Sequence, residues 1–153
     1  MLKIKEFAGL TDDEAKQLYQ APGLIAILIA SADSNIQEDE TDWAKKIIGY
    51  RQEVGVEPLF SYYEIADTYF NDVLHVLMTD DRGNQERIAY LETALAELNP
   101  VLAKLDASFA SELVGSWRTF AKQVAKSAGG FMGFGSISEQ ESRLITLKMI
   151  DVA

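Results

Sequence analysis

The uncharged segment 21–32 restricts the fold of this chain more than any other feature. It contains only alanine, proline, glycine, leucine, isoleucine and a single serine, Ser31. A helix that is apolar on every side belongs inside a protein, surrounded by other elements. The segment is about a dozen residues long, which is short of the ~20 residues that a bilayer span requires. We therefore expect a buried central helix and no membrane span.

Length and composition predict one domain that covers residues 1–153. A chain of 153 residues with 48% hydrophobic and 25% charged residues is typical of a single globular domain. The absence of cysteine excludes disulfides and cysteine-ligated zinc or iron–sulfur centres. The first residues lack the continuous apolar region of a signal peptide, so we expect a soluble, cytoplasmic protein.

The charge of the chain restricts its partners. There are 24 acidic and 14 basic residues, which gives a formal net charge of -10. Such a surface repels phosphate backbones, and no cluster of lysine and arginine offsets the repulsion, so we expect no nucleic-acid partner. A divalent cation or a basic protein surface fits this charge better.

Two capping motifs and a proline predict where the first helices begin. In Thr11–Glu14 the threonine and the glutamate can each bond the other's backbone N–H, which predicts a short helix ending near Gln20. Pro22 suits the first turn of a second, buried helix, where its missing N–H costs nothing. Ser61–Glu64 has the same capping pattern and predicts the start of a later helix.

Apolar side chains recur at helical spacing through the rest of the chain, in segments 43–54, 65–77, 85–98, 102–124 and 138–150. The apolar face of the second of these is expected to hold Ile65, Tyr69, Val73, Val76 and Leu77. Segment 100–128 can form one bent helix or two, because Ser108, Ser111 and Gly115 weaken its middle. No segment alternates as a strand does. We therefore expect an all-α, single-domain bundle of about seven helices around a buried central helix.

The polar loop after the buried segment is the first candidate site, a metal site formed by Asp33, Asn35, Glu38 and Glu40. Carboxylate and amide oxygens are the ligands that calcium and magnesium prefer. The EF-hand spacing is not present, because the twelfth position counted from Asp33 is Ala44 rather than glutamate. In the alternative interpretation, Asp33 and Asn35 shape a turn, and the acidic residues stabilise the start of the next helix.

Polar side chains on the helix predicted after the second capping motif offer further groups. Glu64, Asp67 and Asn71 could complete a cation site begun by the acidic loop. His75 is the only histidine in the chain and the only feature that suggests a hydrolase-type enzyme. No nucleophile motif accompanies it. We therefore expect His75 to be a solvent-exposed helix residue and the protein to have no catalytic activity.

The Gly- and Phe-rich turn at 129–135 is the second candidate site. It lacks the Gly-Lys-Ser/Thr ending of a phosphate-binding loop, and no strand precedes it. Two interpretations of Phe131, Met132 and Phe134 stay open. They pack into the core, as large apolar side chains usually do, or they form a docking surface for a protein partner.

The acidic loop resembles a motif of the TerB-like family, an all-helical family named for tellurite-resistance proteins. In that motif an apolar helix is followed by Ala-x-Ala-Asp-Gly-x-Ile/Val-x-x-x-Glu. Asp33, Ile36 and Glu40 occupy the matching positions, and Ser34 stands where glycine is usual. Segment 135–141 is similar to the second copy of the motif and suggests a pseudo-repeat, although a phenylalanine precedes it in place of the aspartate.

The resemblance implies a non-enzymatic helical module with a role in stress-related protein assemblies. It also implies an acidic surface that binds a divalent cation, calcium or magnesium, or a basic partner. The alternative function is a protein-interaction module that docks through the turn at 129–135 without a metal. A hydrolase is the least favoured function.

Overall fold

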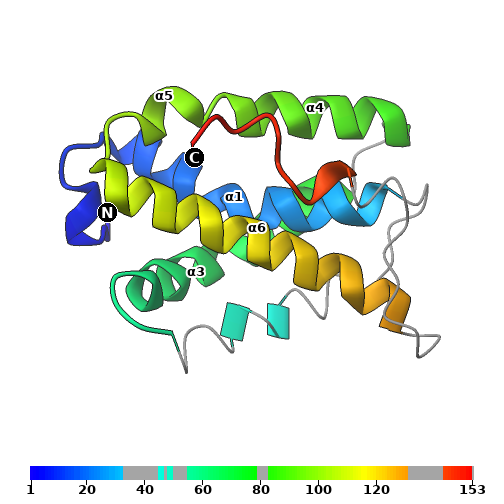
Figure 1. The fold of residues 1–153 in the computed structure, drawn as a ribbon, viewed down its shortest axis with the longest axis horizontal. Coiled ribbons are helices and arrows are strands. Elements are labelled where there is room, and N and C mark those ends of the chain that lie inside the picture. Colours follow the sequence, from blue (N-terminus) through cyan, green and yellow to red (C-terminus); the bar gives the residue numbers. More distant parts are fainter. Residues whose placement is uncertain (33–44, 47, 50–54, 79–82, 131–142, 153) are drawn as a thin grey trace.

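The computed structural model describes residues 1–32, 45–46, 48–49, 55–78, 83–130 and 143–152, and within these ranges every regular element is a helix (Figure 1). In chain order they are η1 (Lys5–Phe7), α1 (Asp12–Ser31), α3 (Leu59–Met78), α4 (Asn84–Ala96), α5 (Asn99–Leu102) and α6 (Ala107–Gly130). The all-α prediction is confirmed. None of the helices in these ranges is both long and apolar enough to cross a bilayer.

Helix α1 lies at the centre of the described fold. Helices α3, α4 and α6 all pack against it, and Figure 1 shows α1 running between α4 and the pair formed by α3 and α6. Every residue of α1 from Ala21 to Ser31 is buried except Leu24, which is half-buried. The predicted buried central helix is therefore confirmed.

The capping box at the start of α1 is also confirmed. The N–H of Glu14 donates to Thr11 Oγ1 at 3.1 Å, and the N–H of Thr11 donates to Glu14 Oε1 at 2.9 Å. The expected end of this helix near Gln20 is wrong, because α1 continues through Pro22 to Ser31. The two helices predicted here are one, so the described residues hold fewer helices than the seven expected.

Tertiary hydrogen bonds explain how α1 passes through a proline. Pro22 has no N–H to donate to the carbonyl of Leu18, four residues earlier, so an isolated helix would lose that bond. The hydroxyl of Tyr62 on α3 donates to Leu18 O at 2.6 Å. Trp117 Nε1 on α6 in turn donates to the Tyr62 hydroxyl oxygen at 3.0 Å. Helix α3 thus supplies the hydrogen-bond donor that the Leu18 carbonyl lacks in its own helix, and α6 holds that donor in place.

Gly23, next to the proline, allows α1 and α3 to approach closely. A Cβ atom built on Gly23 would lie 2.7 Å from Cγ1 of Val73. Any larger side chain at this position would force the two helices apart. The crossing of α1 over α3 is therefore fixed by a residue with no side chain.

The start and the apolar face of α3 differ in part from the expectation. The helix begins at Leu59, and Ser61 inside its first turn donates to Glu57 Oε1 at 2.7 Å, so Ser61–Glu64 is not a capping box. Val76 was expected on the apolar face but is 65% exposed. The buried face instead holds Tyr62, Tyr63, Ile65, Ala66, Phe70, Val73, Leu74 and Leu77.

Segment 100–128 forms two helices rather than one. Helix α5 ends at Leu102, and α6 begins at Ala107 with Asp106 before it. The Asp106 carboxylate accepts the N–H of Phe109 at 3.1 Å, which is the hydrogen bond of a helix N-cap. Ser108, Ser111 and Gly115, which were expected to weaken this region, lie on the exposed side of an uninterrupted α6.

The sequence predicts a helix over 138–150, and this prediction is wrong for most of the part that the structure describes, 143–150. Only 143–144 are helical, and Leu147 has a left-handed φ of 48°, which ends helical backbone there. Arg118 on α6 donates to the carbonyls of Thr146 (2.9 Å) and Ile150 (3.2 Å), and also to that of Val152 (3.2 Å). The segment 143–152 has two turn-type backbone hydrogen bonds of its own, from the N–H of Leu147 to Leu144 O and from the N–H of Ile150 to Leu147 O, and side-chain hydrogen bonds attach it to the rest of the fold.

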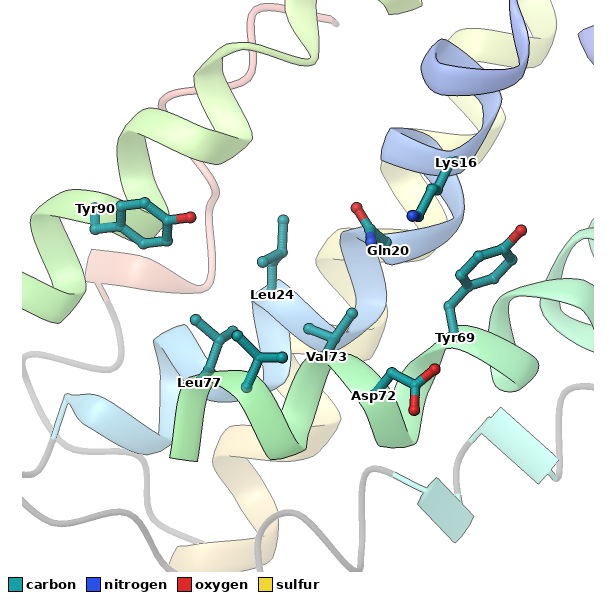
Figure 2. Close-up of a pocket in the computed structure, with 9 residues that line it drawn as sticks. Lys16, Gln20, Leu24, Tyr69, Asp72, Val73, Leu77 and Tyr90 are labelled. Atoms are coloured by element: carbon teal, nitrogen blue, oxygen red, sulfur yellow. The ribbon is translucent and has the colours of Figure 1, made fainter. Parts of the chain in front are cut away.

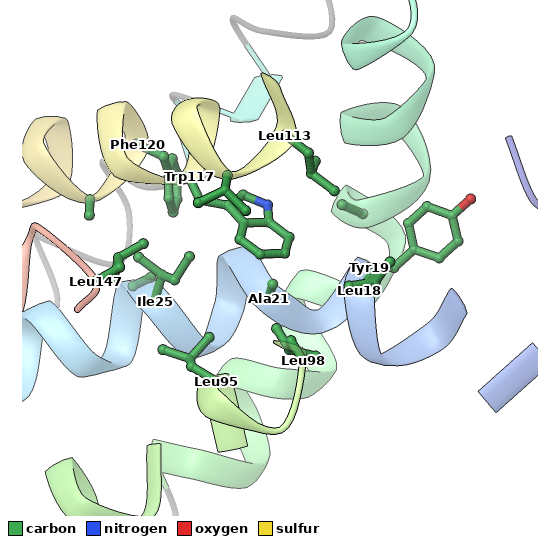
Figure 3. Close-up of a cluster of buried hydrophobic side chains, with 14 of the residues drawn as sticks. Leu18, Tyr19, Ala21, Ile25, Leu95, Leu98, Leu113, Trp117, Phe120 and Leu147 are labelled. Carbon is green, nitrogen blue, oxygen red and sulfur yellow. The ribbon is translucent and has the colours of Figure 1, made fainter. Parts of the chain in front are cut away.

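Part of the core lies where α1, α4, α6 and the C-terminal segment meet (Figure 3), and the buried face of α3 completes it. Trp117 is fully buried against α1, and it is the largest buried side chain of the described residues. The large apolar residues that recur at helical spacing along α6 are all buried, as are those of the C-terminal segment: Phe109, Leu113, Trp117, Phe120, Val124, Leu144, Leu147 and Ile150. The apolar periodicity therefore identified the buried residues even where the helix bounds were wrong.

Candidate functional site

The sequence-predicted metal site lies outside the described residues, because Asp33, Asn35, Glu38 and Glu40 all follow Ala32, where the first described range ends. The structure does describe the helix that leads into it. Ala32 is only 3% exposed, and the Ser31 hydroxyl is buried with no hydrogen-bond partner among the described residues. The acidic loop therefore starts at a helix end that is held inside the core.

The polar face of α3 does not form a metal site by itself. Glu64 and Asn71 are exposed and Asp67 is half-exposed, as the sequence predicts. Within the described ranges, no group of three or more histidine, aspartate or glutamate side chains is close enough to hold a metal ion. A cation site on α3 would therefore need ligands from elsewhere in the chain.

Of the remaining candidates from the sequence, the structure describes His75 but not the apolar residues of the turn at 129–135. His75 is exposed on α3, as expected, and it does not line the groove described below. Helix α6 includes Gly129 and Gly130, so the turn predicted at 129–135 is wrong for these two residues. Phe131, Met132 and Phe134 lie outside the described residues, so the two interpretations of that turn remain predictions.

The described residues form a groove of about 400 Å³ between α1, α3 and α4 (Figure 2). Its lining residues are Lys16, Gln20, Leu24, Tyr69, Asp72, Val73, Val76, Leu77 and Tyr90. Small-molecule sites in proteins have volumes of roughly 300–1,000 Å³. The groove is therefore of ligand size, and sequence reasoning did not predict it.

One end of the groove is polar. Lys16 and Gln20 of α1 face Tyr69 and Asp72 of α3 across it (Figure 2). Among the described residues, neither Lys16 nor Asp72 forms an ion pair. The groove thus offers one ammonium and one carboxylate at the same end.

The Tyr69 ring at this end is held in place by its neighbours. It stacks on the ring of Tyr19, with centroids 5.8 Å apart and planes 5° from parallel. The hydroxyl of Tyr19 accepts the N–H of Ile4 at 2.9 Å, and burial raises the pKa of Tyr19. Tyr69 therefore presents its hydroxyl from a ring of fixed orientation.

The other end of the groove is apolar. Leu24 of α1, Leu77 of α3 and Tyr90 of α4 line it (Figure 2). Val76 is 65% and Tyr90 46% exposed, so two of the large exposed hydrophobic residues in the described ranges lie in one groove. Water-exposed apolar area of this kind gains free energy when a ligand covers it.

Comparisons with known proteins identify no relative. The sequence matches no family model, no curated protein and no solved structure at a significant level. The fold and the groove therefore identify only a class of protein, an all-helical protein with a ligand-sized groove beside its central helix. The resemblance to the TerB-like family remains a prediction that rests on the motif at 30–40.

Proposed function

We propose that this chain is a non-enzymatic helical binding module of the TerB-like kind, whose acidic loop binds a divalent cation or a basic partner. The observation that supports this function is the burial of α1 up to Ala32. Asp33 follows at once, so the first proposed ligand extends from a helix end that cannot shift without disturbing the core. A metal-binding side chain next to such a fixed helix end would lose less conformational entropy on binding.

The chemistry of the loop favours a hard cation. Asp33, Glu38 and Glu40 would supply carboxylate oxygens, and Asn35 would supply an amide oxygen. The net charge of -10 would attract a cation or a basic surface from solution. No competing cluster of ligands exists among the described residues. Calcium and magnesium are therefore the first ions to test.

The remaining features of the TerB-like resemblance belong to the same proposal. The segment 135–141 would form a second, related unit that makes a pseudo-repeat with the loop at 33–40. The module would act in a stress-related protein assembly rather than in catalysis. The buried central helix of the fold is compatible with this assignment.

The experiment is thermal unfolding of the wild type with and without millimolar calcium, and then magnesium. A ligand present at ~100 times its Kd adds about 2.7 kcal/mol to the free energy of unfolding, which raises the Tm visibly. We expect this increase in the wild type and its loss in Asp33→Ala and Glu40→Gln. The matched control is Glu112→Gln, which removes an exposed carboxylate from α6.

Two results would contradict the proposal. The first is a Tm that neither ion changes, together with no binding of a polylysine peptide. The loop would then serve only as a turn and a helix start. The second is an equal ion effect in the wild type and in both loop variants, which would place the bound cation elsewhere.

A further inference from the structure

Along both α1 and α3, the residues that line the groove are polar at one end and apolar at the other. On α1, Lys16, Gln20 and Leu24 follow one another at intervals of four residues, and on α3 Tyr69 and Leu77 are eight apart. Such residues lie on one face of a helix, about 6 Å apart for each four-residue step. The groove thus changes from polar to apolar over about one helical turn.

The polar end requires a ligand head with two opposite charges. A simple carboxylate would pair with Lys16 but would be repelled by Asp72. A simple amine would pair with Asp72 but would be repelled by Lys16. A head that carries both an ammonium and a carboxylate satisfies Lys16 and Asp72 together. The Gln20 amide adds a neutral hydrogen-bonding group at the same end, and Tyr69 also lines it.

The apolar end requires a tail of limited length. On α3, Leu77 is five residues from Asp72, about 8 Å along the helix, which is the reach of a single large side chain, and on α1 Leu24 is one four-residue step from Gln20 and two from Lys16. Covering the exposed surface of Val76 and Tyr90 would supply the apolar part of the binding free energy. An aromatic tail could also pack against the Tyr90 ring.

We propose that this groove binds a small zwitterion with an apolar tail, and that its ligand class is the α-amino acids with large apolar side chains. The carboxylate of the ligand pairs with Lys16, its ammonium pairs with Asp72, and its side chain lies over Leu24 and Leu77. The proposal does not depend on cation binding by the acidic loop.

The test is titration calorimetry of the whole chain with L-phenylalanine and three partial ligands. Phenethylamine lacks the carboxylate, hydrocinnamate lacks the ammonium, and glycine lacks the tail. We expect measurable binding of L-phenylalanine and at least about fivefold weaker binding of each partial ligand, as for loss of a solvent-exposed ion pair or of apolar contact. Binding of phenethylamine or hydrocinnamate as strong as that of L-phenylalanine would overturn the zwitterion assignment.

Variants then connect the binding to this groove. Lys16→Gln and Asp72→Asn should each weaken L-phenylalanine binding by about fivefold, and Val76→Ser should weaken it through the tail. Lys16, Asp72 and Val76 are all exposed, so these changes leave the core intact. The matched controls are Lys122→Gln on α6 and Asp67→Asn on α3, which should bind as the wild type does. No binding at millimolar L-phenylalanine, or unchanged binding in all three groove variants, would overturn the proposal.

Discussion

The hydroxyl of Tyr62 donates a hydrogen bond to the backbone carbonyl of Leu18 at 2.6 Å, and this carbonyl is the one that Pro22 leaves without a helical donor. The two residues are 44 positions apart in the sequence. Because Trp117 donates to the same hydroxyl, the bond ties α1, α3 and α6 together at the centre of the core. The continuity of the central helix therefore depends on side chains from two other helices.

Tyr62→Phe is expected to lower the free energy of unfolding by about 1–3 kcal/mol, because it leaves the Leu18 carbonyl and the Trp117 N–H buried without partners. Chemical denaturation of the wild type and the variant measures the difference. The decisive control is a double-mutant cycle with Pro22→Ala, which restores an N–H that can bond Leu18 O. Tyr62→Phe should cost less in that background, and an equal cost in both would mean that the Tyr62 bond does not compensate for the proline.

Alkaline pH should destabilise the fold through the same residue. Burial first, and the neighbouring Tyr63 second, hold the pKa of Tyr62 well above its ordinary value of 10.0. Below the ordinary pKa of 10.0, Tyr62 is protonated in both the folded and the unfolded chain, so its full contribution to stability is present there. At higher pH only the unfolded chain loses the proton, which favours unfolding. Urea denaturation between about pH 9 and about pH 11 should show falling stability, with a smaller fall in Tyr62→Phe.

Gly23→Ala should destabilise the protein by about 1–3 kcal/mol, as overpacking of a core usually does. The added methyl group would lie within 2.7 Å of Val73 on α3. The matched control is Gly115→Ala on α6, where a Cβ meets nothing within 4 Å and the higher helix propensity of alanine should stabilise. Thermal unfolding of the two variants should therefore shift in opposite directions, and a neutral Gly23→Ala would contradict the close helix crossing.

Arg118→Ala should release the C-terminal segment from α6. The guanidinium holds three carbonyls of that segment, at Thr146, Ile150 and Val152, and no helical bonds replace these. Hydrogen exchange should become faster at the backbone N–H groups of Leu147 and Ile150, while the global stability falls by roughly 1–3 kcal/mol. Lys122→Ala removes another α6 cation and should leave this exchange unchanged. Unaltered protection in Arg118→Ala would show that the Asn99 hydrogen bonds to Met149 and Asp151 and apolar burial hold the segment without the guanidinium.

Acidic pH should weaken the contact between Glu14 on α1 and Lys104, which follows α5 in the chain. The carboxylate of Glu14 accepts a hydrogen bond from Lys104 and another from the N–H of Thr11, and these two bonds lower its pKa below the ordinary value of 4.5. The stabilisation is therefore present above pH 4.5 and is lost as the pH falls through the lower folded-state pKa. Denaturation in this acidic range should show a smaller pH dependence for Glu14→Gln than for the wild type, whereas Glu112→Gln should follow the wild type.

The proposed sites differ in how far the sequence can define them. The ligands of the acidic loop are close together in the chain, so their chemistry can be predicted without a structure, and they remain predictions. The groove joins Lys16 on α1, Asp72 on α3 and Tyr90 on α4, which are far apart in the sequence. Each of these residues by itself is an ordinary surface residue, and no local pattern indicates that they share a groove.

The sequence by itself determined the helical class, the burial of α1 and the core positions of α6, because apolar periodicity reflects which side of a helix avoids water. Thr11 and Glu14 fixed the start of α1 because a capping box needs only neighbouring residues. Only the tertiary structure decided that one helix would continue through Pro22, that Val76 would be exposed and that the segment after Leu144 would not be helical. Each of these outcomes depends on groups from distant parts of the chain, among them Tyr62 for Pro22 and Arg118 for the C-terminal segment.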